Sequence, residues 1–133
     1  MEFEKLGRSY QKVSIRKEFE FHAAHHLPNH EGKCANLHGH TYKLFVTLKD
    51  GVIVTPGYPA EGMVIDFGDL KKIVNALIID LVDHQNLDEV LPFRTTAENM
   101  AGWMLAALLA AELPVTKIEL YETPSACAIV EVE

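Results

Sequence analysis

The chain has 133 residues, 48% of them apolar, and a formal net charge of −7 at neutral pH. This size and composition suit one domain over residues 1–133 that buries a core without cross-links, since two cysteines are too few for a disulfide framework. The acidic balance argues against a nucleic-acid binder, and no apolar run approaches the roughly 18 residues needed to cross a bilayer, so we expect a soluble cytoplasmic protein with neither a nucleic acid nor a membrane as partner.

Two strands are predicted first, after a charged N-terminal extension over residues 1–12 that shows no signal-like apolar stretch. In residues 13–25, alternation places one set of side chains on a common apolar face: Phe19, Phe21, Ala23 and His25. A second strand begins at His38, and its alternate residues as far as Leu48 share one face. His38 and His40 are therefore predicted to be neighbours on that face.

Two amphipathic helices are predicted next. The first begins near Asp66 or Asp69, either of which can cap it, and its apolar stripe is Leu70, Ile73, Val74, Leu77, Ile78 and Leu81. The second begins near Thr95, which has the capping-box spacing with Glu98, and ends before Pro114. Its stripe is Met100, Trp103, Met104, Ala107, Leu108 and Ala111.

Two further strands, over residues 116–122 and 127–133, complete the chain. The order β-β-α-α-β-β predicts an α+β fold in which an antiparallel sheet carries both helices on one face. The opposite sheet face is mixed in character: His22, Thr41, Lys43, Phe45 and Thr47. A second subunit can cover such a face, so a homo-oligomer is predicted.

Three histidines form a candidate metal site. His25, His38 and His40 come from strands that can pair, and they can converge on Zn²⁺ at roughly 2.0–2.1 Å. Cys34 precedes His38 by four positions, which allows a closed structural site with Cys34 as fourth ligand or an open site with the thiol facing a substrate. We favour the open site because a domain with two long amphipathic helices does not need a metal to fold.

Three further residues are candidates for chemistry or ligand binding: Asp83, His84 and Glu122. Asp83 can orient His84 and raise its basicity, although a solvated helix end also accounts for this pair. Glu122 shares a strand face with Ile118 and Leu120, so its carboxylate is predicted to lie on the apolar face of the sheet. The adjacent N–H and amino groups of a planar ligand would satisfy both of its oxygens, unless the strand end frays into solvent.

Six segments resemble, in order, the 6-pyruvoyltetrahydropterin synthase and 6-carboxytetrahydropterin synthase family: "FHAAHHLP", "CANLHGHTYKL", "EGMVIDFGDLK", "VDHQNLD", "TAENMA" and "LYETPSACA". The resemblance implies a T-fold that assembles as a hexamer, a dimer of trimers, with active sites between subunits. It implies zinc ligands His25, His38 and His40. Cys34, Asp83 and His84 are the implied catalytic residues, and the implied substrate contacts are Glu122 on the pterin ring, Thr96 and Glu98.

The implied substrate is 7,8-dihydroneopterin triphosphate, for whose phosphates Lys33 and Arg94 are candidate contacts. Three residues between Cys34 and the His-Gly-His are typical of the carboxy branch of queuosine and deazapurine biosynthesis, which forms 6-carboxy-5,6,7,8-tetrahydropterin and releases acetaldehyde and triphosphate. The segments "VDHQNLDEV" and "RTTAEN" resemble the pyruvoyl branch of tetrahydrobiopterin synthesis, which is the alternative. A non-catalytic zinc-binding structural or regulatory domain is a third hypothesis, although it would not need Cys34 together with the Asp83–His84 pair.

Overall fold

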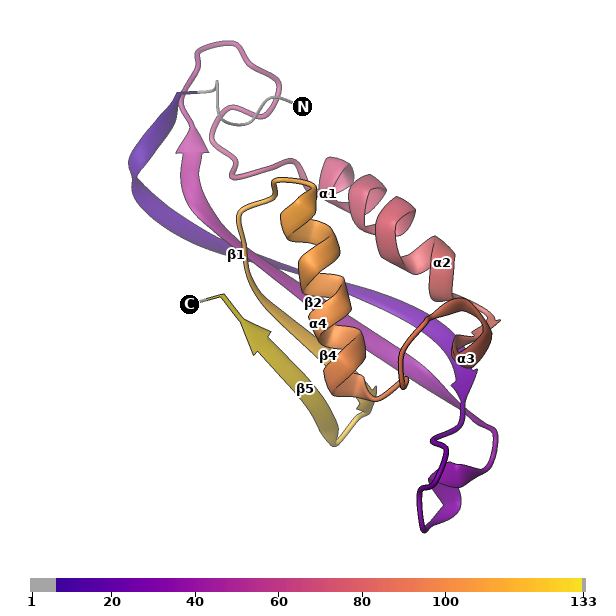
Figure 1. The fold of residues 1–133 in the computed structure, drawn as a ribbon. Coiled ribbons are helices and arrows are strands. Elements are labelled where there is room, and N and C mark those ends of the chain that lie inside the picture. Colours follow the sequence, from indigo (N-terminus) through magenta and orange to yellow (C-terminus); the bar gives the residue numbers. More distant parts are fainter. Residues whose placement is uncertain (1–6, 133) are drawn as a thin grey trace.

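The computed structural model describes residues 7–132, in which a five-stranded sheet has the order β3-β1-β2-β4-β5 (Figure 1). Four strands pair antiparallel, as predicted: β1 (Arg8–His25), β2 (His38–Ile53), β4 (Val115–Thr123) and β5 (Ala126–Glu131). The two-residue strand β3 (Gln85–Asn86) adds to the edge of β1 in parallel, which makes the sheet mixed. A strand of this length is too short to leave an alternating pattern in the sequence.

The β1–β2 hairpin has the predicted alternation of buried and exposed side chains. Phe21 pairs with Tyr42 and both are fully buried, and the final pair of the hairpin joins His25 to His38. The strand β1 begins at Arg8, within the segment 1–12 that was expected to be an extension, and residues 1–6 lie outside the described part of the chain. The hairpin therefore delivers the histidines of both strands to the same end of one sheet face.

The first predicted helix is one continuous rod with a wide turn inside it. The helix α1 (Phe67–Val74) is capped by Asp66, and it continues through a π-helical segment, η3 (Asn75–Ile79), into α2 (Asp80–Val82). The prediction that Leu81 faces the core is wrong, because its side chain is 51% exposed while Val82 is buried. The wider π turn rotates the residues that follow it, so Val82 takes the inward position.

The second long helix, α4 (Ala97–Ala110), starts one residue later than predicted. The hydroxyl of Thr96, not that of Thr95, accepts the hydrogen bond from the backbone N–H of Asn99, so the predicted capping box is wrong. The predicted inward position of Ala111 is also wrong: this residue is the C-cap, lies beyond the last helical turn and is exposed. The inward face of α4 is Met100, Ala101, Met104, Leu105 and Leu108.

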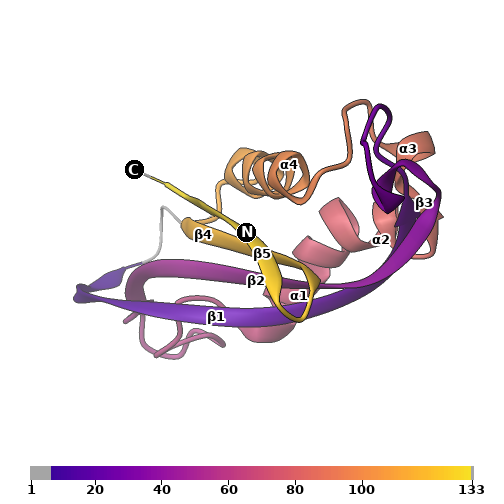
Figure 2. The same ribbon diagram turned by 90° about the horizontal axis from the view of Figure 1, so that it is seen from below.

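One continuous core joins the helices to a single face of the sheet. Figure 2 shows α4 lying over the strands of the C-terminal hairpin. The core includes the inward residues of three strands and the stripes of the helices: Phe21, Tyr42, Leu44, Ile118, Leu120, Leu70, Ile78, Met100, Met104 and Leu108. Two short helical elements, η2 (Lys33–Ala35) and α3 (Leu87–Val90), lie in the connections. No helix within residues 7–132 combines the length and apolarity required to span a membrane.

Candidate metal centre

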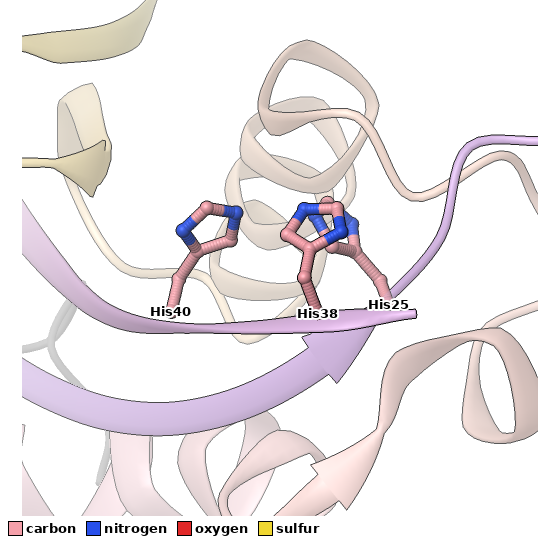
Figure 3. A group of neighbouring side chains, drawn as sticks. All are labelled: His25, His38 and His40. Atoms are coloured by element: carbon pink, nitrogen blue, oxygen red, sulfur yellow. The ribbon is translucent and has the colours of Figure 1, made fainter. Parts of the chain in front are cut away.

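The imidazole rings of His25, His38 and His40 converge where β1 ends and β2 begins, all on the core side of the hairpin (Figure 3). Their ring centroids are 4.7 Å apart for His25 and His38, 4.8 Å for His38 and His40, and 5.3 Å for His25 and His40. One ring nitrogen from each residue lies within 4.8 Å of those of the other two. The arrangement has the ligand type and number of an open three-histidine zinc site.

Hydrogen bonds to main-chain carbonyls identify the protonated nitrogens of two of these rings. His25 Nδ1 lies 2.8 Å from the carbonyl oxygen of Thr95, and His38 Nδ1 lies 2.7 Å from that of Asn36. Because a carbonyl oxygen only accepts, each Nδ1 carries a proton, which leaves Nε2 as the nitrogen with the lone pair in the neutral ring.

All three Nε2 atoms are buried without a hydrogen-bond partner in the described part of the chain. A buried polar nitrogen without a partner costs free energy, and three such nitrogens in one place suit a metal ion. The residues present therefore fit Zn²⁺.

The electrostatic surroundings keep His40 in its metal-binding form. Burial is the main reason that the pKa of His40 is lowered from its ordinary value; the Glu122 carboxylate opposes this, and the neighbouring His25 and His38 add to it. Glu122 lies close to two ligand atoms, with Oε1 3.5 Å from His40 Nε2 and Oε2 3.9 Å from His25 Nε2. The lowered pKa of His40 favours its neutral imidazole, the form that binds a metal ion, beside the side chain of Glu122.

A further buried polar atom without a partner among residues 7–132 belongs to Tyr42. Its ring lies 5.5 Å from that of His40 and 6.2 Å from that of His25, measured between centroids, and stacks on Phe21. Burial raises the pKa of Tyr42, so the phenol stays protonated at neutral pH. The ring of Tyr42, stacked on Phe21, therefore lies between the three histidines and the core.

Cys34 is a half-buried free thiol in η2, between the two strands of the hairpin. Its carbonyl oxygen accepts a 2.7 Å hydrogen bond from the backbone N–H of Leu27, which ties the connection together. The group of converging ligand atoms within residues 7–132 consists of histidines and contains no cysteine. The catalytic role of Cys34 stays a prediction.

Asp83 and His84 form the predicted pair, with Asp83 Oδ1 3.0 Å from His84 Nδ1. Asp83 also accepts a hydrogen bond from the backbone N–H of His22, which lowers the pKa of this carboxyl. The ring of His84 contacts that of His22, on the opposite face of β1 from His25. Within one chain, the structure therefore does not bring this pair to the three histidines.

The three predicted substrate contacts line one cavity. Glu122, Thr96 and Glu98 border a space of about 420 Å³, together with residues of the β4–β5 hairpin. Glu122 connects this cavity to the metal centre through its contacts with His25 and His40. The two candidate phosphate contacts are not brought together there: Arg94 borders a different cavity, and Lys33 is exposed in η2.

Two residues beside the metal centre were missed from the sequence. Thr95 is fully buried and faces His25 with its carbonyl and its hydroxyl, and Asp88 accepts a hydrogen bond from that hydroxyl. From the sequence, Thr95 is interpreted as a helix cap, and no role is assigned to Asp88. The signal available was the pair of adjacent threonines, of which only one can cap α4.

Comparison with known proteins shows the family to which the chain belongs. The profile of the 6-pyruvoyl tetrahydropterin synthase family matches residues 14–133. The 6-carboxy-5,6,7,8-tetrahydropterin synthase of Haemophilus influenzae is 42% identical over 133 aligned residues, covering 84% of this chain and 93% of that protein. The Synechocystis protein of the same name is 40% identical over 116 residues, covering 86% and 89%.

Among solved structures, the 6-pyruvoyl tetrahydropterin synthase of Caenorhabditis elegans is 30% identical and superposes with a TM-score of 0.79, covering 96% of this chain and 100% of that one. This likeness confirms the T-fold expected from the sequence. The matched profile, the aligned relatives and the shared fold together show that the chain belongs to the 6-pyruvoyl tetrahydropterin synthase family.

Proposed function

We propose that the protein is a zinc-dependent enzyme that converts 7,8-dihydroneopterin triphosphate and one water into 6-carboxy-5,6,7,8-tetrahydropterin, acetaldehyde and triphosphate. The observation that carries this proposal is the set of three buried Nε2 atoms, those of His25, His38 and His40, which have no hydrogen-bond partner in the described part of the chain and lie beside the cavity that Glu122 borders. The names of the Haemophilus and Synechocystis relatives support the carboxy product.

His25, His38 and His40 would hold the zinc ion, which when bound supplies Lewis-acid polarisation of the hydroxyl groups on the substrate side chain. Glu122 would accept two hydrogen bonds from the pterin edge and so fix the ring. The thiolate of Cys34 would move protons on the substrate side chain, because a nearby positive charge favours the ionised form of a thiol.

The second acid-base group would be His84, oriented by Asp83. Since this pair lies on the opposite sheet face from the histidines of its own chain, we propose that each active site receives the pair from a neighbouring subunit. A symmetric homo-oligomer, expected here as a hexamer, repeats such a contact at every site. The same contact would cover the outer sheet face, where Phe45 and Tyr121 are only partly buried.

The reaction is tested by incubating zinc-loaded protein with 7,8-dihydroneopterin triphosphate and identifying the products by mass. We expect 6-carboxy-5,6,7,8-tetrahydropterin and acetaldehyde in equal amounts. A 6-pyruvoyl product without acetaldehyde would instead assign the protein to tetrahydrobiopterin synthesis. Absence of turnover in fully zinc-loaded protein would favour the non-catalytic zinc-binding domain.

The Glu122→Gln variant is expected to bind the pterin about ten- to a hundredfold more weakly while keeping its fold, because one acceptor oxygen becomes a donor that faces ligand donors. The measurement is the dissociation constant for a non-reactive pterin, with thermal unfolding as the control for folding. Substitution of Glu119 by Gln is the matched control, since Glu119 lies on the same strand but pairs with Arg16 on the outer face. An unchanged affinity in Glu122→Gln would remove Glu122 from the pterin site.

A further inference from the structure

One side of the metal centre is connected to a buried network of side chains. His25 and Thr95 are both fully buried, and His25 Nδ1 lies 2.8 Å from the Thr95 carbonyl oxygen and 3.1 Å from its hydroxyl oxygen. Because the Nδ1 proton points to two acceptors of Thr95, the hydroxyl hydrogen of Thr95 is free to be donated elsewhere. It is donated to Asp88 Oδ1, at 2.9 Å.

The other oxygen of Asp88 reaches the residue that follows His25. Asp88 Oδ2 accepts a 2.9 Å hydrogen bond from the backbone N–H of His26 and lies 2.6 Å from His26 Nδ1. Asp88 is in α3, Thr95 precedes α4, and His26 follows β1. One carboxylate therefore connects three segments around a single ring, that of His25.

His25 and His38 each have a main-chain carbonyl as the nearest partner of Nδ1, but His25 also has a side-chain hydroxyl as a second partner. The Nδ1 partner of His38 is the main-chain carbonyl of Asn36, in an exposed connection. No side-chain substitution removes that acceptor. Substitutions can, by contrast, remove the hydroxyl and the carboxylate that lie behind His25.

We propose that Asp88 and Thr95 are positioning residues for His25, acting as one unit that aims its Nε2 at the metal position. The inference rests on the proposed zinc site and adds the residues that determine its affinity. A carboxylate connected to a metal-binding histidine through hydrogen bonds orients the ring and strengthens it as a ligand. A purely structural Asp88 would anchor α3 to β1 through His26 and leave zinc affinity unchanged.

The experiment measures zinc affinity by competition with a chelator in purified full-length variants. Thr95→Val keeps the side-chain shape and the carbonyl but removes the hydroxyl, and we expect zinc affinity to fall by about ten- to a hundredfold. Thr95→Ser keeps the hydroxyl and is expected to stay within a few-fold of the wild type. Thermal unfolding of the metal-free proteins separates a loss of affinity from a loss of folding.

Two further variants sharpen the test. Thr41→Val removes an equivalent threonine–histidine hydrogen bond, 3.0 Å to His22 on the outer face, and should leave zinc affinity unchanged. Asp88→Asn should weaken zinc binding by a factor similar to Thr95→Val. The double variant should lose little more than either single variant, because residues that act as one unit have non-additive effects.

The outcomes separate this inference from the proposed function. If the wild type binds zinc and folded Thr95→Val binds it equally tightly, the positioning role is wrong and the zinc site stands. Additive losses in the double variant would show that Asp88 acts independently of Thr95 and would overturn the unit proposed here. If the wild type itself binds no zinc, the proposed function and this inference both fail.

Discussion

The His40→Ala variant is expected to purify without zinc, whereas the wild type should hold about one ion per chain. The reason is geometric: an open site has three protein ligands, and removing one leaves two imidazoles that cannot hold the ion against solvent. The measurement is the metal content of the purified protein by mass spectrometry. Because His40 is only partly buried, its removal should leave the fold intact.

The matched control is His22→Ala, which removes an imidazole from the outer face of the same hairpin. Its ring contacts Thr41 and His84, and its zinc content should equal that of the wild type. Full zinc content in His40→Ala would show that this histidine is not a ligand. The three-histidine site would then have to be abandoned.

The Cys34→Ala variant is expected to keep its zinc and lose turnover by the roughly 10²–10⁴-fold that follows removal of a positioned acid-base group. If Cys34 were a fourth zinc ligand, the same substitution would remove a thiolate–metal bond and lower metal affinity and stability together. Zinc content and product formation are therefore measured on the same preparation. Loss of zinc would return Cys34 to a closed structural site and remove it from the mechanism.

Mixing two inactive variants tests whether the active site is shared between subunits. If Cys34 and His84 act on one substrate from different subunits, oligomers assembled from equal amounts of Cys34→Ala and His84→Ala chains contain both groups at about a quarter of their sites. Activity should then reappear in the mixture, although each parent is inactive. A mixture as inactive as its parents would place both groups in the same chain.

Much of the metal centre could be predicted from the sequence because strands repeat every two residues. Alternation along β1 and β2 assigned His25, His38 and His40 to the core side before any pairing was known, and the structure confirms those faces. The alternation along β4 likewise predicts that Glu122 lies on the apolar face of the sheet, where its carboxylate contacts His25 and His40. These features follow from local geometry, which a single sequence carries.

What could not be predicted depends on tertiary contacts. Thr95 and Thr96 are equally good helix caps by type, but the hydroxyl of Thr95 bonds with His25 and Asp88, and that of Thr96 caps α4. The position of the Asp83–His84 pair depends on the pairing of β3 with β1. The strand β3 has only two residues, too few to show an alternating pattern in the sequence. The sheet face on which the pair lies could therefore not be inferred.

The π turn in the helix before Asp83 also limits where the fold tolerates insertions and deletions. Each residue of an α-helix turns the chain by about 100°, so deleting one residue from η3 would turn Asp83 and the segment after it by more than a quarter of a circle. The first part of the connection after β2, residues 54–59, lies outside the regular elements and is mostly exposed, so it has no such helical phase to keep. Insertions and deletions in related chains should therefore collect between β2 and α1, and be rare between Asn75 and Asp88.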